Sequence, residues 1–347
     1  MSKILITGGA GFIGSHAAEY FAGKGYDVVV YDNLSRSELL GKDDKNAKFN
    51  WNYLKKIKRI KLIKGDVRDF ESLRKNGSDA DIVVHTAAQT AVTTSVINPE
   101  PDFSVNVIGT FNVLELARRS KKKPSIIYCS TNKVYGHNVN KVKVLEEKKR
   151  YKFEDKYRHG IPEDFSIDLC EHTPYGCSKL SGDIYMQDFS YQYGLKIGVF
   201  RMSCIYGTRQ FGVEDQGWVS WFAIATLMNR PITIYGDGKQ VRDVLFVKDL
   251  ISIYDTFLKS NIPYGVFNTG GGNKKTLSLL ELLDILEETT GKRSPISFAE
   301  WRPSDQKVYI SNISKAKRKL GWEPKIAPKE GVTKLVEWIK ENKKIFS

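Results

Sequence analysis

The pentapeptide YGCSK, residues 175–179, carries a phenol and an ammonium group four positions apart, directly after Pro174. Proline is frequent at the first position of a helix, and this spacing places Tyr175 and Lys179 on one helix face. A tyrosine with a pKa of about 10 is a poor base at neutral pH, but a neighbouring positive charge favours the phenolate. We expect Tyr175 to exchange a proton with a substrate hydroxyl, with Lys179 lowering its pKa.

Thr131 closely follows an apolar run, residues 126–129, that is typical of a buried strand. A hydroxyl group at a strand end can align a reacting hydroxyl with the phenol, although it can also satisfy loop backbone. Asn132 and Lys133 come next, either beside this hydroxyl or in a surface loop. Thr93 can line the same pocket or cap a helix.

A glycine-rich turn follows the apolar run at residues 3–7. Gly9, Gly11 and Gly14 satisfy the spacing GxGxxG, and Gly8, Gly11 and Gly14 satisfy the wider spacing GxxGxxG. Glycines at these positions permit a tight turn and a close approach of backbone N–H groups to a pyrophosphate at a helix N-terminus. The pattern predicts a dinucleotide site.

Acidic residues at the ends of the next two predicted strands complete this pattern. Asp32 stands at about the spacing expected for a carboxylate on a ribose 2′-hydroxyl, which favours NAD over NADP, although the nearby Arg36 leaves NADP open. Asp66 can accept from the adenine amino group with Val67 against the ring, or it can cap a helix. The expected cofactor-binding residues are Gly8, Gly11, Phe12, Ile13, Gly14, Asp32, Asn33, Leu34, Ser35, Arg36, Asp66, Val67, Ala87, Ala88, Gln89, Tyr175 and Lys179.

His85 lies at the end of the fourth apolar run, just before Thr86, Ala87 and Ala88. We expect it to be a core histidine with satisfied ring nitrogens, although a catalytic base is the alternative. Two arginines further along, Arg242 and Arg302, have the forked donors that suit a diphosphate, or they form ion pairs with Asp243 or Asp305. Arg209 and Gln210 are weaker candidates for contacts to the sugar or the base.

Strand-like runs alternate with helical patterns over the first two hundred residues, which predicts an α/β fold with a doubly wound parallel sheet. The runs lie at residues 3–7, 27–32, 60–66, 81–87, 125–130 and 196–201. Glycines, aromatic residues and short elements dominate after residue 201, which indicates a smaller interleaved lobe. We expect a cofactor-binding domain at 1–203, to which about 240–265 returns, and a substrate-binding lobe at 204–239 and 266–347.

Composition limits the alternatives. The chain of 347 residues has 54 Lys and Arg against 40 Asp and Glu, a net charge of +14, but these lysines are scattered and no nucleic-acid motif accompanies them. The basic balance also suits an anionic small substrate. No 18-residue apolar run and no signal-peptide pattern is present, so we expect a cytoplasmic protein without a membrane span. The four cysteines lack metal-ligand spacing; we expect reduced, mostly buried thiols and no metal site.

The glycine fingerprint, Asp32, HTAAQ (85–89), STNKVYG (130–136) and YGCSK together resemble the extended short-chain dehydrogenase/reductase family along the whole chain. The resemblance implies a Rossmann domain, bound NAD and a nucleotide-sugar substrate in the C-terminal lobe. It also implies a homodimer, or a dimer of dimers, in which helices at about 100–118 and 176–193 pair across a two-fold axis. Four apolar residues on these helices suit that contact or the intrachain core: Phe111, Leu114, Tyr185 and Phe189.

The residues after Thr131 discriminate among the reactions of this family. The resemblance implies that Asn132 and Lys133 contact the sugar or the diphosphate, unless they belong to a surface loop. In dehydratases that the chain resembles, an Asp-Glu pair at these positions supplies acid and base, but here they are Asn132 and Lys133. An amide cannot deliver that proton and an ammonium cannot act as the carboxylate base, so dehydration is disfavoured.

Longer motifs extend the resemblance. STNKVYG, HTPYGCSK, RQFGVEDQGW, GDGKQVRDVL and SDQKV resemble the family members that convert CDP-paratose to CDP-tyvelose. This implies that tightly held NAD oxidises carbon 2, the 2-keto sugar turns its other face, and hydride returns. The alternatives are a UDP-glucose 4-epimerase, a 2-epimerase of other CDP-, GDP- or UDP-sugars, and a non-enzymatic protein that binds nucleic acid or senses NAD.

Overall fold

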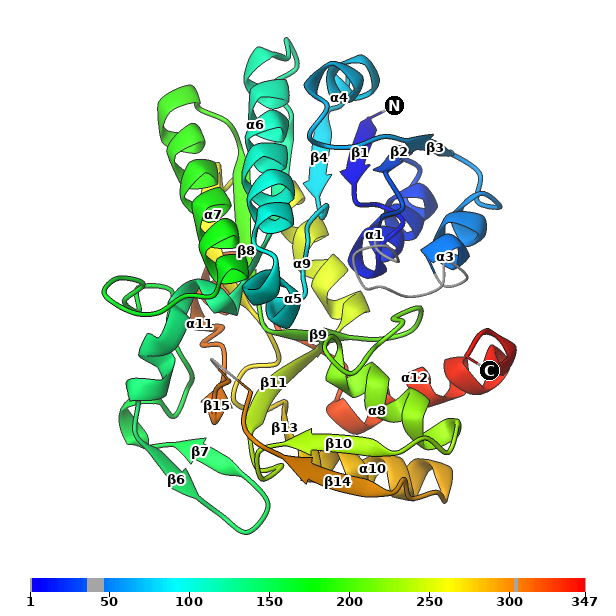
Figure 1. Cartoon of the computed structure of the whole chain (residues 1–347). Helices are drawn as coiled ribbons and strands as arrows, with labels where there is room; N and C mark the ends of the chain where they lie inside the picture. The colour runs from blue at the N-terminus through cyan, green and yellow to red at the C-terminus, as the bar shows by residue number, and fades with distance from the viewer. Residues whose placement is uncertain (1, 36–46, 303–304, 347) are drawn as a thin grey trace. The chain divides into compact units, whose positions relative to one another are not determined.

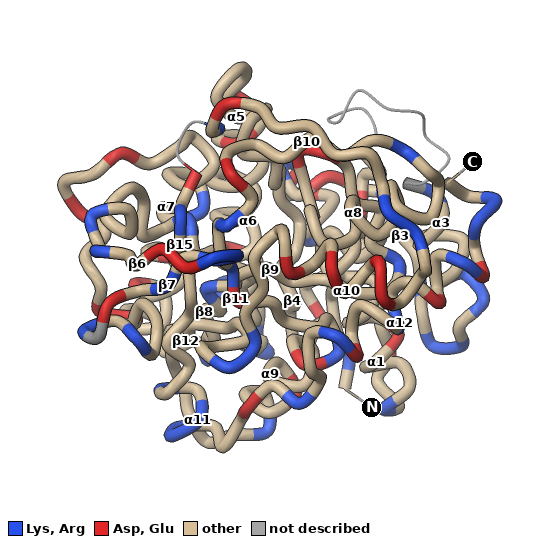
Figure 2. The backbone as a smooth tube through the Cα atoms, turned by 90° about the horizontal axis from the view of Figure 1, so that it is seen from below, with Lys and Arg blue, Asp and Glu red and all other residues tan. Residues whose placement is uncertain are grey.

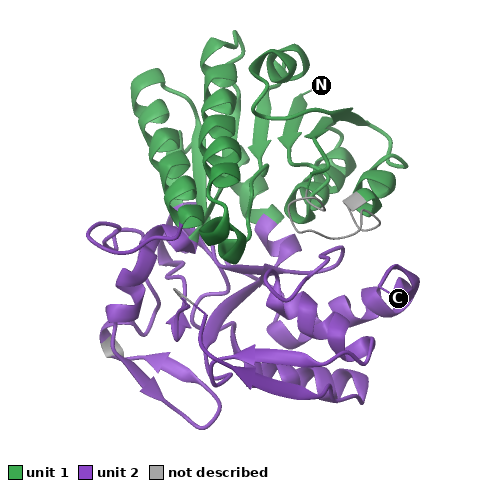
Figure 3. Ribbon diagram, in the orientation of Figure 1, with its two compact units in different colours: residues 1–131, 174–201, 251–266 green, residues 132–173, 202–250, 267–347 purple. Residues whose placement is uncertain are grey.

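The computed structural model describes residues 2–35, 47–302 and 305–346, and these group into two units (Figure 3). The first unit comprises residues 1–131, 174–201 and 251–266. The second unit comprises residues 132–173, 202–250 and 267–347. Arg36, one of the expected cofactor residues, lies outside the described residues.

A seven-stranded sheet organises the first unit, with the strand order β12-β8-β5-β4-β1-β2-β3 (Figure 1). Its strands are β1 Lys3–Thr7, β2 Asp27–Asp32, β3 Ile60–Lys64, β4 Ile82–His85, β5 Ser125–Thr131, β8 Ile197–Met202 and β12 Tyr264–Thr269. Strand β1 pairs in parallel with β2 on one side and β4 on the other, and the pairs β2–β3 and β4–β5 are also parallel. The predicted doubly wound sheet is confirmed, because the order runs outward in both directions from β1.

Helices cover both faces of this sheet. They are α1 Phe12–Gly23, α3 Ala47–Leu54, α4 Phe70–Gly77, α5 Val92–Ile97, the π-helical η1 Asp102–Ile108, α6 Gly109–Arg119, α7 Pro174–Tyr193 and α9 Val247–Lys259. Val199 of β8 packs in a core cluster with residues of α4, α6 and α7. The next residue, Phe200, contacts Tyr254 and Phe257 of α9. Since neighbouring strand residues point to opposite faces, strands covered on both sides must be apolar throughout, as these are.

Helix α7 lies unusually close to strand β5. A Cβ atom added at Gly182 would lie 2.3 Å from the hydroxyl oxygen of Tyr128, so only glycine permits this approach. One turn of the helix is also held by a buried ion pair, in which both nitrogens of the Arg201 fork donate to Asp183 at 3.0 Å. Ser130 Oγ donates to the same carboxylate at 2.6 Å. These contacts fix α7 against the strand that ends at Thr131.

The His85 ring lies in the core, as expected. Its Nδ1 is 2.6 Å from Thr7 Oγ1 and its Nε2 is 3.0 Å from Thr110 Oγ1, and the ring stacks on Tyr128. Both ring nitrogens therefore have partners, and the side chain is only 1% exposed. The interpretation as a satisfied core histidine is confirmed.

The second unit is built from short elements. Its helices are η2 Asn132–Lys141, η3 Asp155–Tyr157, α8 Trp218–Leu227, α10 Leu279–Thr290, α11 Ser314–Leu320, α12 Pro328–Glu341 and η4 Lys343–Ile345, and its strands are β6 Val144–Glu146, β7 Tyr151–Phe153, β9 Cys204–Tyr206, β10 Ile232–Tyr235, β11 Val241–Phe246, β13 Thr276–Ser278, β14 Ile296–Ala299 and β15 Val308–Tyr309. Strand β11 is central, because it pairs with β9, β13 and β15. Strands β10 and β14 form a separate parallel pair, and β6 and β7 a hairpin.

The unit boundaries differ from the expected ones in two places. Residues 132–173, expected in the cofactor-binding domain, belong to the second unit, because the Tyr151 N–H donates to Lys239 O at 2.9 Å and Ile161 forms a bridge with Ser311. The segment that returns to the first unit is 251–266, since the preceding β11 pairs with strands of the second unit.

Lys and Arg are interspersed with Asp and Glu over the backbone (Figure 2), and exposed lysines often pair with carboxylates, as Lys329 does with Glu288 at 2.6 Å. Within the described residues, no helix combines the length and apolar character needed to cross a membrane. The expectation of mostly buried cysteines is wrong: Cys129 is buried, Cys170 and Cys204 are partly exposed, and Cys177 is exposed on α7.

We predict that His85 makes the fold sensitive to acid. Burial, helped by the positive charge of Lys179, lowers the pKa of His85 to about 3, against about 6.5 in an unfolded chain. Between these values the unfolded chain binds a proton that the folded chain does not. The contribution of His85 to the free energy of unfolding is therefore complete above about pH 6.5 and falls by about 1.4 kcal/mol per pH unit below it. Urea unfolding between about pH 7 and pH 5 measures this slope.

The control for this measurement separates His85 from the carboxylates that also titrate in acid. His85→Gln removes the ring, so its stability should fall less steeply with decreasing pH, whereas the exposed His159→Gln should keep the wild-type slope. Equal slopes for wild type and His85→Gln would contradict the prediction.

Candidate functional site

The first unit brings together the three residues expected to carry the chemistry. Thr131 is the last residue of β5, and Tyr175 and Lys179 lie one turn apart at the start of α7. The Tyr175 phenol shares a hydrogen bond with the Thr131 side chain. The Lys179 Nζ lies 4.3 Å from the centre of the ring of Tyr128, which precedes Cys129 on β5. The arrangement places a phenol, a hydroxyl and an amine around one strand end.

The electrostatics of this group differ from the expectation. Burial raises the pKa of Tyr175 to about 12, against a smaller opposite effect of the hydrogen bond with Thr131, and Lys179 is not among the groups that lower it. Burial also lowers the pKa of Lys179 to about 8. The expectation that Lys179 lowers the pKa of Tyr175 is therefore not met by the chain alone. The cause is desolvation, which favours the neutral form of both partners.

Residues that the sequence analysis missed fix the start of α7. The Tyr175 N–H donates to Ser95 Oγ of α5 at 3.2 Å. Ser178 Oγ donates to the Tyr175 carbonyl at 2.9 Å and accepts from Asn106 Nδ2, also at 2.9 Å. Asn106 belongs to η1, so two neighbouring elements hold the helix end. The signal was an asparagine and a serine on the inner faces of helical patterns, where apolar residues predominate.

The glycine turn between β1 and α1 has the geometry of an anion-binding loop. Gly8 adopts φ +68°, and a Cβ there would lie 2.5 Å from the Ala87 nitrogen. A Cβ on Gly14 would lie 2.4 Å from Gly8 O, so the helix can pack on the turn only with glycine at this position. Gly11 caps α1 without a side-chain hydrogen bond, and Phe12 and Ile13 begin the helix. The helix N-terminus thus has no side-chain cap of its own, which suits a phosphate group.

Asp32 joins this turn to the end of β2. Its Oδ2 accepts from the Ala10 N–H at 2.9 Å and its Oδ1 from the Leu34 N–H at 2.8 Å. Each carboxylate oxygen keeps a second lone pair for a hydroxyl donor. Burial raises the pKa of this carboxyl, and the two backbone hydrogen bonds oppose that rise. Leu34 has φ +62°, a strained conformation for leucine, and Asn33 Oδ1 accepts from both the N–H and the hydroxyl of Ser35.

Asp66 is already engaged by neighbours in the chain. It forms an ion pair with Arg68 at 2.7 Å and accepts from Asn33 Nδ2 at 2.9 Å. The Arg68 contact is the largest cause that lowers the pKa of Asp66 to about 2. The helix-cap alternative for Asp66 is wrong, because Asp69 caps α4. Val67 is buried in the core cluster of the first unit.

The loop after β4 is held rigidly against η1. Ala87 and Ala88 follow His85, and the next residue, Gln89, is 3% exposed. Its side chain bonds both backbone groups of Ala91, and its main chain exchanges two hydrogen bonds with Asn106. Thr93, on α5, does not cap that helix, because the cap position is Ala91. Its Oγ1 is buried and, among the described residues, has no hydrogen-bond partner.

Within the second unit, Lys133 lies in a cluster of charges with Arg242 and Asp305. Arg242 Nη2 contacts Asp305 Oδ1 at 2.5 Å, and its Nη1 donates to Gln306 O at 2.6 Å. Burial lowers the pKa of Lys133 to about 8, with a further lowering by the Arg242 charge and an opposing effect of Asp305. Asn132 precedes it in η2. The Arg242–Asp305 ion pair expected as an alternative is present, whereas Asp243 is buried elsewhere, against Ser203 and Gly272.

The remaining expected substrate residues of this unit each have their own surroundings. Arg302 pairs with Asp215 at 3.1 Å, and its guanidinium lies 3.9 Å from the centre of the Tyr235 ring. Arg209 is 6% exposed and has φ +60°. Gln210 donates to Ile205 O at 3.2 Å, while its Oε1 is buried and accepts no hydrogen bond from the described residues. Both expected phosphate-binding arginines are thus paired with carboxylates.

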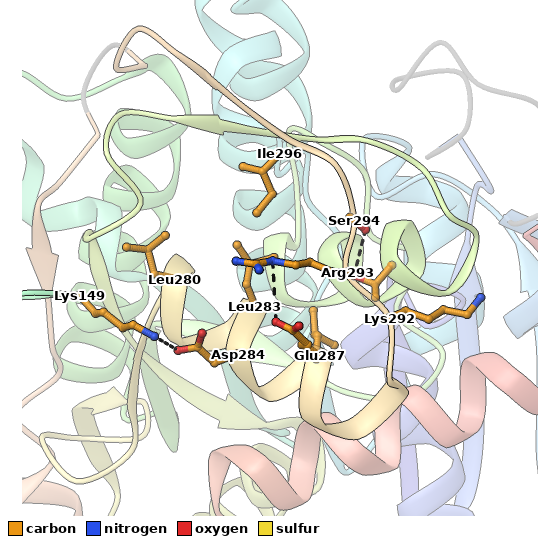
Figure 4. Close-up of a pocket in the computed structure, with 11 residues that line it drawn as sticks. Lys149, Leu280, Leu283, Asp284, Glu287, Lys292, Arg293, Ser294 and Ile296 are labelled. Carbon is orange, nitrogen blue, oxygen red and sulfur yellow. Dashed lines mark hydrogen bonds and ion pairs between the residues drawn. The ribbon is translucent and has the colours of Figure 1, made fainter.

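A small cavity of about 150 Å³ lies elsewhere in the second unit (Figure 4). Leucines of α10 and Ile296 line it, and the pair Lys149–Asp284 closes one side at 2.6 Å. None of the residues expected to bind cofactor or substrate lines this cavity. Among the described residues, no cluster of histidine, cysteine and carboxylate side chains could hold a metal ion.

The known proteins that this chain resembles are enzymes of nucleotide sugars. A family model described as GDP-mannose 4,6-dehydratase matches residues 5–335. The chain is 41% identical to CDP-paratose 2-epimerase of Salmonella typhi over 345 residues, 97% of this chain and 98% of that protein. It is 33% identical to a putative UDP-glucose 4-epimerase of Methanocaldococcus jannaschii over 341 residues, 98% and 99% of the two chains. The structure of UDP-glucuronic acid 4-epimerase from Bacillus cereus with UDP-glucuronic acid and NAD aligns with a TM-score of 0.81 at 29% identity, over 98% and 99%.

We predict that two lysines, Lys133 and Lys179, titrate near pH 8. Burial disfavours their ammonium forms, so both should lose a proton well below the value of about 10.4 for a solvated lysine. NMR of protein labelled at the lysine Cε carbons follows each amine directly. Lys133→Arg and Lys179→Arg should each delete one of the two signals that move near pH 8, and the exposed Lys24→Arg should delete neither. Signals that stay constant up to about pH 10 would refute this.

Proposed function

Since the chain belongs to the GDP-mannose 4,6-dehydratase family of the extended short-chain dehydrogenases/reductases, we propose that it is an epimerase which inverts carbon 2 of a nucleotide-linked hexose. The reaction is of the type that converts CDP-paratose to CDP-tyvelose. The observation that carries the choice of carbon 2 is the 41% identity with CDP-paratose 2-epimerase over 97% of the chain. Identity with the putative UDP-glucose 4-epimerase is lower, at 33%.

The cofactor is NAD, which when bound supplies reversible hydride acceptance from a sugar carbon. The residues of the first unit fit it: the uncapped N-terminus of α1 and the turn at Gly8 suit the pyrophosphate, and Asp32 has acceptor capacity for a ribose hydroxyl. Backbone around Ala87 and Ala88 offers a wall without bulky side chains. Gly11, Phe12, Ile13, Gly14 and the Asn33–Ser35 turn complete the proposed site, while Asp66 and Val67 flank its adenosine end.

Tyr175 is proposed to remove the proton of the sugar hydroxyl and to return it when the hydroxyl forms again. Thr131, which shares a hydrogen bond with the phenol, holds the hydroxyl in line. In the chain alone burial raises the pKa of Tyr175 to about 12, so the phenol is the resting form. A positive charge at the cofactor ring and the ammonium of Lys179 favour the phenolate when the site is filled. Lys179 also holds the nicotinamide ribose in this proposal.

The second unit is proposed to bind the nucleotide sugar. Lys133, Arg242 and Arg302 supply positive charge for the diphosphate, and Asn132, Arg209 and Gln210 are assigned to the sugar or the base. Thr93, which belongs to the first unit, is assigned to the sugar. Dehydration is disfavoured, because the residues that follow Thr131 are an amide and an amine where a carboxylate acid and base are needed. A 4-epimerase acting on UDP-glucose remains the second candidate, supported by the UDP-sugar 4-epimerases among its relatives. The cytoplasmic location stays a prediction.

We predict that CDP-paratose deuterated at carbon 2 gives CDP-tyvelose that keeps the label. Hydride leaves and returns within one closed site, so the deuterium has no path to water. NMR of the product reports the position of inversion and the label together.

Denatured enzyme should release close to one NAD or NADH per chain. Tyr175→Phe should slow turnover by about 100-fold to 10,000-fold while keeping its cofactor.

Three outcomes would contradict parts of this assignment. Label lost to water would exclude the hydride mechanism. Inversion at carbon 4 of UDP-glucose, with carbon 2 untouched, would select the second candidate. Unchanged turnover in Tyr175→Phe would remove the tyrosine from the reaction.

A homodimer through α6 and α7 is also part of the proposal. Of the four residues considered, Leu114 and Phe189 are core residues, with exposures of 0% and 5%, whereas Phe111 and Tyr185 are exposed by 41% and 44%. The two exposed rings lie edge to face, with 5.9 Å between their centres. Ile108 and Ile184, also about half exposed, extend the same apolar surface across η1 and α7. Such a surface is typical of a protein interface.

We predict that Phe111→Glu converts the protein to a monomer of 39.4 kDa. A two-fold axis brings each substitution into the interface twice, and burying an unpaired carboxylate is strongly unfavourable. Light scattering after size-exclusion chromatography measures the mass. Phe298→Glu, at an exposed aromatic residue of β14 outside this surface, should leave the mass unchanged. A monomeric wild type, or a Phe111→Glu protein of unchanged mass, would contradict the interface.

A further inference from the structure

A buried carboxyl group that the proposed reaction does not use lies at the start of η1. Asp102 is 0% exposed, and its Oδ2 accepts from Gln89 Nε2 at 2.8 Å. Its Oδ1 is also buried and receives no hydrogen bond from another residue of the described chain. A carboxylate kept out of water with one oxygen unsatisfied costs stability. A residue with that cost and no structural partner for half of its acceptor groups calls for a functional explanation.

The partner of Asp102 has no freedom to turn. The Gln89 Oε1 accepts from the Ala91 N–H, and its Nε2 donates to the Ala91 carbonyl at 3.0 Å as well as to Asp102. Since the oxygen of the amide is used by an N–H group, the nitrogen must face the carboxyl group. Asp102 Oδ2 is therefore held as a hydrogen-bond acceptor.

A continuous chain of hydrogen bonds links this pair to Tyr175. The Gln89 main chain exchanges bonds of 2.9 and 3.0 Å with Asn106, and Asn106 donates to Ser178 Oγ at 2.9 Å. Ser178 Oγ in turn donates to the Tyr175 carbonyl. Asp102 and Asn106 lie one turn apart on η1, so both residues that bond Gln89 come from this one helix. Short π-helical segments of this kind are frequent at functional sites.

Burial is the largest cause that raises the pKa of Tyr175, and the negative charge of Asp102 raises it further. Helix α7 carries five exposed titratable groups: Cys177, Tyr185, Asp188, Tyr191 and Tyr193. The buried or ion-paired titratable groups around η1 are Lys179 and Asp183 on α7, Tyr128 and Cys129 on β5, His85 on β4, Glu115, Arg118 and Arg119 on α6, and Arg68 near Ser104 of η1. Burial keeps Tyr128, Cys129 and His85 neutral through their shifted pKa values.

The remaining charges in this set are paired, apart from two. Asp183 is paired with Arg201, Glu115 with Arg118 and Arg119, and Arg68 with Asp66. Asp102 and Lys179 are left as charges of opposite sign around Tyr175. Burial raises the pKa of Asp102 to about 6, so its charge is present at neutral pH.

We propose that Asp102 is a positioning residue of the acid/base site, which fixes the start of α7 through Gln89 and Asn106 and whose negative charge holds the proton on Tyr175. The proposal rests on the proposed role of Tyr175 in epimerisation. An epimerase uses the same group first as base and then as acid, so neither the phenol nor the phenolate can be strongly favoured. Lys179 and a filled cofactor site favour the phenolate. Asp102 supplies the opposing charge.

The test measures the two ionisations in the protein as purified with its cofactor. Protein labelled at the aspartate Cγ and tyrosine Cζ carbons is titrated by NMR, with signals assigned by Asp102→Asn and Tyr175→Phe. We expect Asp102 to titrate between about pH 5 and pH 7. In Asp102→Asn, which keeps the shape and the acceptor oxygen, Tyr175 should ionise about 0.5 to 1 pH unit lower than in wild type. The acid limb of turnover on the accepted nucleotide sugar should move in the same direction.

Matched variants and outcomes decide the proposal without any assumption about the sugar. Glu71→Gln removes one negative charge from an exposed pair on α4 and should leave Tyr175 unchanged. A Tyr175 titration that is the same in wild type and Asp102→Asn would overturn the proposal, even if the enzyme proves to be a 2-epimerase. If Asp102→Asn does not fold, the wild type decides, because the Tyr175 signal must then show a small inflection where Asp102 ionises. Its absence would overturn the proposal.

Discussion

The contact between Gly182 of α7 and Tyr128 of β5 is the constraint on which the site depends. A side chain at position 182 would occupy the space of the phenol oxygen, 2.3 Å away, and would force helix and strand apart. That separation would carry Tyr175 and Lys179 away from Thr131, because the first two lie on the helix and the third ends the strand. The Asp183–Arg201 ion pair and Ser130 add a fixed register to this close approach. Packing at one glycine thus determines whether phenol and hydroxyl meet at all.

Close packing also excludes water from the site, and this desolvation shifts the pKa values of its buried ionisable groups. Burial raises the pKa of Tyr175 and Asp102 and lowers that of Lys179 and His85, so each group is moved toward its neutral form. A charge in such surroundings acts strongly on its neighbours, since little water screens it. The ionisation of Tyr175 therefore depends on the whole set of buried groups around it, rather than on Lys179 alone.

The parts of this molecule that a sequence can predict are those encoded by local pattern. Apolar runs predicted six strands of the parallel sheet, and the spacing of Tyr175 and Lys179 predicted their common helix face, because both depend on residues close together in the chain. The effect of burial on the pKa of Tyr175 in the chain alone was missed, because desolvation depends on segments brought together by folding. The partnership of Gln89 with Asp102 and Asn106 was missed for the same reason. The segment 132–173 was misassigned because its partners, Lys239 and Ser311, lie far along the chain.

The second unit shows how an amine can stand where a related dehydratase needs a carboxylate. Burial lowers the pKa of Lys133, the charge of Arg242 lowers it further, and Asp305 raises it. With a pKa of about 8, roughly nine-tenths of Lys133 is charged at neutral pH, so the position carries positive charge without a strong acid or base. In the chain alone, Asp305 pairs with Arg242 and Asp215 pairs with Arg302. The diphosphate proposed for this unit would have to compete with these carboxylates, so its charge, more than the identity of its base, would determine how tightly it binds.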